Sequence, residues 1–129
     1  MNKKILITIV IVLVLVLTAL IYKGRFNLLG DCGSKIAKEF LSDNNRIKIE
    51  ASIWDCGATT DYSTHLSLID IDTHSSNEIV VLKGDHSSDL NVVWLNSEKV
   101  SIEFKGSMED VFNLKNKINK IEFEIKVLK

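Results

Sequence analysis

The sequence predicts an α+β protein, in which an N-terminal transmembrane helix precedes a small, mostly antiparallel β-sheet domain with one short helix. Two observations lead to this expectation. Residues 5–22 form an uncharged apolar run that only two threonines interrupt. Later segments, such as residues 47–54 and 121–127, alternate apolar and polar side chains with the period of two that a half-buried strand requires.

The distribution of charge divides the chain in two. Four of the 16 basic residues and none of the 17 acidic residues lie in residues 1–25, so 12 basic and 17 acidic side chains remain for the rest. We expect a basic membrane anchor over residues 1–25, a tether over residues 26–33 and an extracytoplasmic α+β domain over residues 34–129. The acidic balance of this domain disfavours nucleic acid as a partner.

The apolar run is long enough to cross a membrane. Its 18 residues would form a helix about 27 Å long, so we expect residues 5–22 to contact the lipid bilayer. A cleavable secretory signal is the alternative. Because the run is longer than the usual apolar region of about 7–15 residues, and because no small-x-small site follows it, we favour an uncleaved anchor.

The two cysteines bear on the orientation of this anchor. Basic residues flank the apolar run on both sides and do not decide it. Cys32 and Cys56 are an even pair, which in a domain outside the cytoplasm typically forms a disulfide. We therefore expect a cytoplasmic N-terminus and an extracytoplasmic domain. Two unpaired thiols in a domain that faces the cytoplasm are the alternative.

The folded part is predicted to begin with the short helix, over residues 35–41. Ser34 would be its N-cap, and Ile36 and Phe40 would share one helical face. Strands are predicted to follow at residues 47–54, 65–72, 78–83, 90–95, 99–105 and 121–127. The phase of the apolar residues changes within residues 65–72, which predicts a bulge or burial on both faces. Residues 107–114 could form a short helix or a strand.

The best candidate site is the stretch from Asp55 to Thr64, which is rich in small and hydroxyl side chains. Gly57, Thr59, Thr60 and Ser63 could form a polar cup for a small ligand. In the alternative, the disulfide and these hydroxyls only fix a tight connection by bonding to nearby backbone groups.

The remaining polar motifs do not support a metal or a cofactor. His65, His74 and His86 match no zinc-ligand spacing with the cysteines, and residues 70–81 lack the glycine and the final glutamate of a calcium loop. No serine is flanked by the glycines of a nucleophile elbow, so a Ser-His-Asp triad has no specific support. We predict no metal, no cofactor and no catalytic residues.

Residues 32–104 resemble an uncharacterised family of small bacterial envelope proteins. The resemblance rests on Cys32-Gly33, the turn at residues 41–44 and the Cys-Gly-Ala-Thr-Thr motif at residues 56–60. Family members have a Ser-Pro-Asp-Gly turn, whereas Asp43-Asn44-Asn45 of this chain has neither proline nor glycine. The resemblance implies paired cysteines and a location in the cell envelope, and it adds no chemistry.

These observations predict a membrane-anchored, non-enzymatic binding or interaction module of unknown ligand. The alternative is a small envelope hydrolase that uses the region from Thr59 to His65.

Overall fold

The computed structural model describes residues 2–22, 32–57 and 61–129. Its contacts divide the chain into two compact units, Met1–Asp31 and Cys32–Lys129. We describe each unit by itself.

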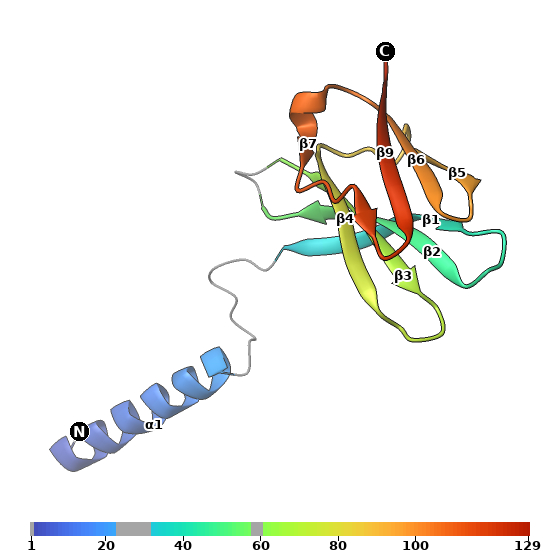
Figure 1. Ribbon diagram of the computed structural model, residues 1–129. Coiled ribbons are helices and arrows are strands. Elements are labelled where there is room, and N and C mark those ends of the chain that lie inside the picture. The colour runs from blue at the N-terminus through green and yellow to red at the C-terminus, as the bar shows by residue number, and fades with distance from the viewer. Residues whose placement is uncertain (1, 23–31, 58–60) are drawn as a thin grey trace. The chain divides into compact units, whose positions relative to one another are not determined.

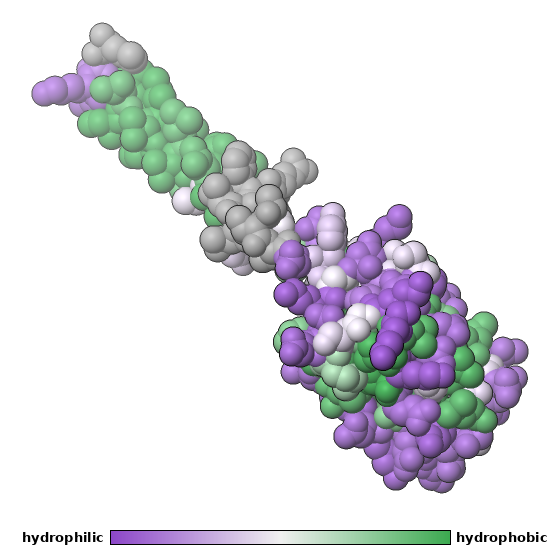
Figure 2. Space-filling view, turned by 90° about the horizontal axis from the view of Figure 1, so that it is seen from above, coloured by the Kyte–Doolittle hydropathy of each residue, from purple (hydrophilic) through white to green (hydrophobic). Residues whose placement is uncertain are grey.

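The first unit contains helix α1 (Lys3–Tyr22), whose apolar side chains are exposed along its length. Figure 2 shows this surface as a nearly continuous apolar cylinder. The hydroxyl of Thr8 donates to the carbonyl of Lys4, and that of Thr18 donates to the carbonyl of Leu15, each at 2.9 Å. Both threonines therefore satisfy their polar groups inside the helix. The helix predicted over the apolar run is confirmed.

The second unit consists of two β-sheets (Figure 1). The first sheet has the strand order β1-β2-β3-β4-β7, and its strands are β1 (Gly33–Leu41), β2 (Ile47–Asp55), β3 (Ser63–Asp70), β4 (Ser76–Lys83) and β7 (Val111–Phe112). The second has the order β5-β6-β9-β8, and its strands are β5 (Asn91–Asn96), β6 (Lys99–Lys105), β8 (Lys117–Ile118) and β9 (Ile121–Leu128).

The strands pair mostly antiparallel, as predicted. The exception is β9, which lies between β6 and β8 and runs parallel to β6, with Lys99 opposite Glu122 and Lys105 opposite Leu128. The α+β class, with one long N-terminal helix and an antiparallel β domain, is confirmed. The division of the domain into two sheets is a feature that the sequence pattern did not predict.

The short helix predicted over residues 35–41 is wrong, because this segment is strand β1. It pairs with β2 from Gly33 opposite Asp55 to Leu41 opposite Lys48. A bulge between Ile36 and Lys38 shifts the register and leaves Ile36 exposed, while Phe40 packs against the core. Backbone pairing along nine residues outweighs a helical spacing that rests on few apolar residues.

A bulge lies in the β3–β4 ladder, but on β4 and not within residues 65–72, where the change of phase predicted a bulge or burial on both faces. Leu66 pairs with Val80 and Ser67 pairs with Glu78, so Ile79 is an extra residue on β4. Ile79 and Val80 are both fully buried, which explains the run of consecutive apolar residues in this strand. Residues 108–110 form a single 3-10 turn (Met108–Asp110) and β7 follows it, so both readings of residues 107–114 hold in part.

One apolar core lies between the two sheets. The first sheet contributes Ile49, Ala51, Leu66, Leu68, Ile79, Val80 and Leu82. The second sheet and its connections contribute Leu90, Val92, Val100, Ile102, Phe104, Ile118, Ile121 and Phe123. Each sheet therefore buries the apolar side chains of its inner face against the other sheet.

Candidate functional site

The predicted disulfide is present. Cys32 and Cys56 are bonded, with their Cα atoms 4.0 Å apart, beside the pair Gly33 and Asp55 where β1 begins and β2 ends. The next residue, Gly57, has a backbone φ of 116°, and its N–H donates to the Asp55 carboxylate at 3.1 Å. The bridge and this turn fix the first part of the predicted polar loop.

The rest of the predicted cup is divided. Thr59 and Thr60 lie outside the described residues, so the structure does not place them. Ser63 is the first residue of β3, on the sheet face opposite the core, because its neighbour Thr64 is fully buried. Among the hydroxyl side chains of the predicted cup, Ser63 is therefore the one that the structure describes.

Ser63 belongs to a chain of three hydrogen-bonded side chains. Its Oγ lies 3.0 Å from Nε2 of His65, and Nδ1 of His65 lies 3.0 Å from the carboxylate of Glu78. The ring of Trp54 packs against the His65 ring with the ring centroids 4.9 Å apart. Because the Ser63 hydroxyl can donate to Nε2 while Nδ1–H donates to Glu78, a neutral imidazole satisfies both contacts.

This order of serine, histidine and carboxylate is that of an activated nucleophile, its general base and an orienting acid. The local sequence does not predict this arrangement, because no serine is flanked by the glycines of a nucleophile elbow. Ser63 and His65 are two residues apart on one strand, and Glu78 comes from β4. The predicted strand begins at residue 65 and leaves Ser63 in the preceding loop, and the β3–β4 register that brings in Glu78 includes a bulge.

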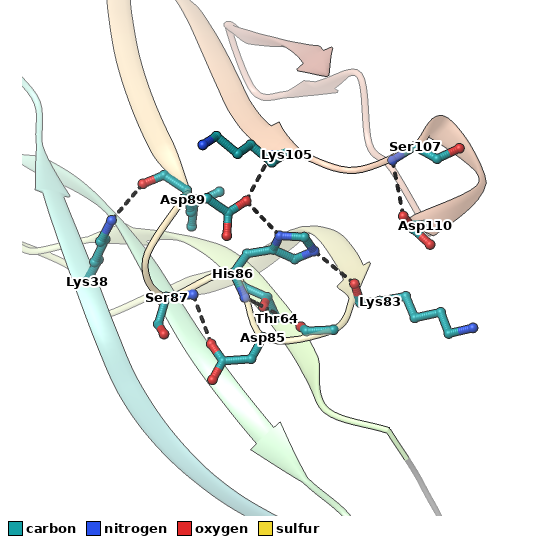
Figure 3. A network of polar contacts seen from close by, with 12 residues as sticks. Lys38, Thr64, Lys83, Asp85, His86, Ser87, Asp89, Lys105, Ser107 and Asp110 are labelled. Carbon is teal, nitrogen blue, oxygen red and sulfur yellow. Dashed lines mark hydrogen bonds and ion pairs between the residues drawn. The ribbon is translucent and has the colours of Figure 1, made fainter. Parts of the chain in front are cut away.

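A second polar network surrounds His86, whose residue surface is only 8% exposed (Figure 3). Nδ1 lies 2.9 Å from the Asp89 carboxylate, and Nε2 lies 2.8 Å from the carbonyl oxygen of Lys83. The same Asp89 oxygen accepts the backbone N–H of Lys105 at 2.8 Å. The sequence predicts that His86 is no metal ligand but a polar residue of a loop, and the structure places it in this hydrogen-bond network.

The network favours the ionised form of Asp89. Burial raises the pKa of Asp89, but the hydrogen bonds from His86 and the Lys105 amide, together with the charge of His86, outweigh it and lower the pKa. A carboxylate that is largely buried is therefore kept ionised by its hydrogen-bond donors near the end of β6.

The network also joins the two sheets. The N–H of His86 donates at 3.0 Å to the hydroxyl of Thr64 in β3, and that hydroxyl donates at 2.8 Å to the carbonyl of Gly84. On the other side, Asp89 binds the end of β6 through Lys105. The connection between β4 and β5 is thus held against a strand of each sheet, which indicates a structural role for His86.

A cleft of about 410 Å³ opens where β2 and β4 begin and β3 ends, which is the end of these strands opposite to the disulfide. Its lining comes from several turns and strand ends, namely Ile47, Leu68, Asp70, Ser75, Asn77, Ser97, Glu98, Asn119, Lys120 and Ile121. A smaller pocket of about 90 Å³ shares Ile47 and Ser97 with the cleft and is also lined by Ser42, Asp43, Asn44, Trp94 and Asn96. Within the described part of the chain, the buried indole N–H of Trp94 has no hydrogen-bond acceptor.

The aspartates near His74 stabilise a turn. Asp70 accepts the N–H groups of Asp72 and Thr73 at 2.9 and 3.1 Å, and His74 has a left-handed backbone at φ 57°. Among residues 2–22, 32–57 and 61–129, no three His, Cys, Asp or Glu side chains are close enough together to hold a metal ion.

Helix α1 is the one described helix that is long and apolar enough to cross a membrane, with 20 residues and a mean hydropathy of 3.2 over its most apolar window. Residues 1–117 match the sequence model of a family of unknown function, DUF5412. The chain belongs to this family. No curated protein and no solved structure matches the chain.

The DUF5412 match covers α1, the disulfide, the Ser63 chain and the His86 network, and it ends inside β8. It therefore supports the predicted membership of a family without an assigned activity. The cleft draws Asn119, Lys120 and Ile121 from beyond the matched residues.

Proposed function

We propose that this DUF5412 protein is a single-pass membrane protein that presents a non-enzymatic binding module outside the cytoplasm. In this proposal α1 anchors the chain in the bilayer, the N-terminus is cytoplasmic, and residues 32–129 face the extracytoplasmic side. The disulfide supports this orientation, because such bonds persist in oxidising compartments. The acidic balance of the region after residue 25 continues to disfavour nucleic acid as the partner.

The observation that carries the binding role is the position of the cleft within the domain. Strand β1 leads from Cys32, where the described domain begins, to Leu41, and Ser42 after it lines the smaller pocket. Its nine residues span about 30 Å. The cleft thus lies at the end of the domain that is remote from the attachment to the anchor, where a tethered module can meet its partner.

Labelling of the two cysteines tests the orientation. We expect a membrane-impermeant maleimide to label Cys32 and Cys56 in intact cells only after treatment with an impermeant reductant. The Cys32→Ser, Cys56→Ser double variant is the matched control and should stay unlabelled. Labelling that needs cell lysis, or that needs no reductant, would overturn the proposed location.

Photo-crosslinking tests the binding role. A photo-reactive amino acid in place of Asn77, which is exposed and lines the cleft, should give a discrete adduct in living cells. The control position is Ser88, which is exposed in the connection between β4 and β5. If position 77 gave no adduct beyond that at position 88, the cleft would not be a binding surface and the proposal would fail.

The Ser63–His65–Glu78 chain favours a second candidate function, an ester hydrolase. Ser63 Oγ would bond to the carbonyl carbon of an ester while its proton passes to Nε2 of His65 and then to the leaving alcohol. Water would release the acid in a second step. Hydrolysis of p-nitrophenyl acetate by the full chain tests this role: Ser63→Ala should abolish turnover and Glu78→Gln should lower it. Equal rates in the wild type and Ser63→Ala would reject it.

A further inference from the structure

We propose that the cleft binds a neutral saccharide, and that the Trp94 indole N–H donates a hydrogen bond to a sugar hydroxyl. This inference rests on the proposed binding function and specifies the chemistry of its ligand. It is carried by three features of the cleft and of the smaller pocket that shares Ile47 and Ser97 with it. They are the common rim, the apolar floor of the cleft and the unused donor of Trp94, which lines the smaller pocket.

The rim is rich in neutral side chains that both donate and accept hydrogen bonds. They are the amides of Asn44, Asn77, Asn96 and Asn119 and the hydroxyls of Ser42, Ser75 and Ser97. Hydroxyl and amide groups of this kind match the peripheral hydroxyls of a sugar, which also donate and accept. They come from different turns, so a ligand that contacts several of them has to be a compact, multiply hydroxylated molecule.

The charged side chains of the rim have both signs. They are Lys120 and three carboxylates, those of Asp43, Asp70 and Glu98, and the carboxylate of Asp70 also accepts backbone N–H groups of its own turn. The excess of carboxylates disfavours a phosphorylated ligand. The neutral amides and hydroxyls that outnumber these charges favour a neutral ligand.

The floor of the cleft is apolar and is formed by Ile47, Leu68 and Ile121, which also belong to the core or pack against it. A pyranose ring exposes C–H groups on its faces, and an apolar floor can cover them. The cleft volume of about 410 Å³ is within the range of about 300–1,000 Å³ that is usual for small-ligand sites. This volume and the adjoining pocket favour an oligosaccharide end over a single sugar.

Trp94 supplies the most specific observation. Its indole N–H is buried and lacks an acceptor among the described residues. Trp94 lines the smaller pocket together with Asn96 and Ser97. An unpaired buried donor is unfavourable, and an oxygen of a bound hydroxyl would relieve it. Because the nitrogen is covered in the free domain, side chains that line the smaller pocket have to move when the ligand enters.

Tryptophan fluorescence gives a direct test, because the chain has two tryptophans. Trp54 packs on His65 of the Ser63–His65–Glu78 chain and does not line the cleft. The Trp54→Phe variant therefore has Trp94 as its single tryptophan. The full chain is placed in lipid nanodiscs, without glycosidic detergent, and titrated with cellotetraose, maltotetraose and chitotetraose. We expect a saturable change in Trp94 emission with at least one of them.

The matched variants separate a binding role of Trp94 from a structural one. Trp94→Phe keeps an aromatic ring that can pack against the core and removes the unpaired N–H, so the domain should stay folded, which its thermal unfolding will show. Its affinity, measured by calorimetry, should fall by about 3- to 10-fold, which corresponds to one neutral hydrogen bond. Trp54→Phe should leave affinity unchanged. An unchanged affinity in Trp94→Phe would refute the role of the N–H.

Other outcomes distinguish this inference from the binding function itself. Asn77→Ala at the rim should weaken saccharide binding, whereas Asn91→Ala, an exposed asparagine of β5 outside the lining, should not. No binding of any of the three saccharides would overturn the ligand class, and so would binding of polyphosphate or polyglutamate alone. The crosslinking at position 77 would then still decide whether the cleft binds a partner of another class.

Discussion

Nδ1 of His86 lies 2.9 Å from the carboxylate of Asp89, and this contact closes the network that holds the connection between β4 and β5 to both sheets. Neither side chain is fully exposed, since 10% of the His86 side chain and 17% of the Asp89 side chain are accessible. Removal of either partner would therefore leave a largely buried polar group without its hydrogen bond, which costs more than the loss of an ion pair on the open surface.

Replacement of Asp89 should destabilise the domain in a pH-dependent way. We expect Asp89→Asn to lower the free energy of unfolding by about 1.5–3 kcal/mol at neutral pH, because a hydrogen-bonded charge is lost. The folded-state pKa of Asp89 lies below the unfolded value of about 3.9. The stabilisation is thus present above that value and disappears as the pH falls through the lowered folded pKa.

Urea denaturation of the wild type and Asp89→Asn between pH 7 and pH 2 measures this effect. Asp72→Asn is the control, since the Asp72 side chain is 70% exposed and makes only a 4.0 Å contact with Arg46. A difference between wild type and Asp89→Asn that stayed constant down to pH 2 would contradict the assignment.

Loss of the disulfide should cost stability without loss of the fold. The bond joins residues that are 24 positions apart, and closing a loop of that size stabilises a domain by about 3 kcal/mol in the chain-entropy model. Pairing along β1 and β2 remains when the bond is broken. The Cys32→Ser, Cys56→Ser variant should therefore unfold at lower urea with an unchanged circular dichroism spectrum at zero urea.

The glycines differ sharply in their tolerance of a side chain. A Cβ on Gly106 would lie 2.9 Å from the ring of Phe104, which is fully buried and cannot move freely. At Gly33, the nearest atom would be 3.8 Å away. We expect Gly106→Ala to destabilise the domain by about 1–3 kcal/mol and Gly33→Ala to change stability by at most about 0.5 kcal/mol. Equal effects in thermal denaturation would contradict this contrast.

Two leucines test the core in the same manner. Leu66 is fully buried between the sheets, and Leu41 at the end of β1 is 55% exposed. Truncation of a buried leucine removes apolar burial and leaves a cavity, so Leu66→Ala should cost about 2–5 kcal/mol. Leu41→Ala should have an effect within about 0.5 kcal/mol. Chemical denaturation of both variants, compared with the wild type, provides the measurement.

A charge in the middle of α1 should weaken membrane integration. Leu13 is near the centre of the helix, and an arginine at the centre of a spanning helix costs about 2.5–3.5 kcal/mol on insertion scales. Leu13→Arg should therefore lower the fraction of the chain that stays in membranes on alkaline carbonate extraction, while Leu13→Ile should not. Equal retention of both variants would argue against a spanning helix.

Local patterns predicted much of this fold. The apolar run of α1 and the alternation in β2 and β9 follow from the order of apolar side chains along a few residues. The segment 35–41 was mispredicted because Ile36 and Phe40 have a helical spacing, yet their structure is decided by pairing with β2. That pairing is a tertiary interaction that a local pattern does not contain.

The candidate sites were less predictable for the same reason. Ser63 was selected from its own loop, whereas its contact to Glu78 through His65 depends on the register of β3 with β4. The cleft depends still more on the tertiary fold, because its lining comes from turns near residues 42, 75, 97 and 120. Nothing in the local sequence of those turns indicates that they meet.

The central place of β9 in the second sheet has a consequence for biosynthesis. β9 is the last strand along the chain and is hydrogen-bonded on both sides, by β6 and by β8. During translation, β6 lacks this neighbour until residues 121–128 have left the ribosome. The second sheet, and the core that it shares with the first sheet, is therefore completed only after translation has passed residue 128.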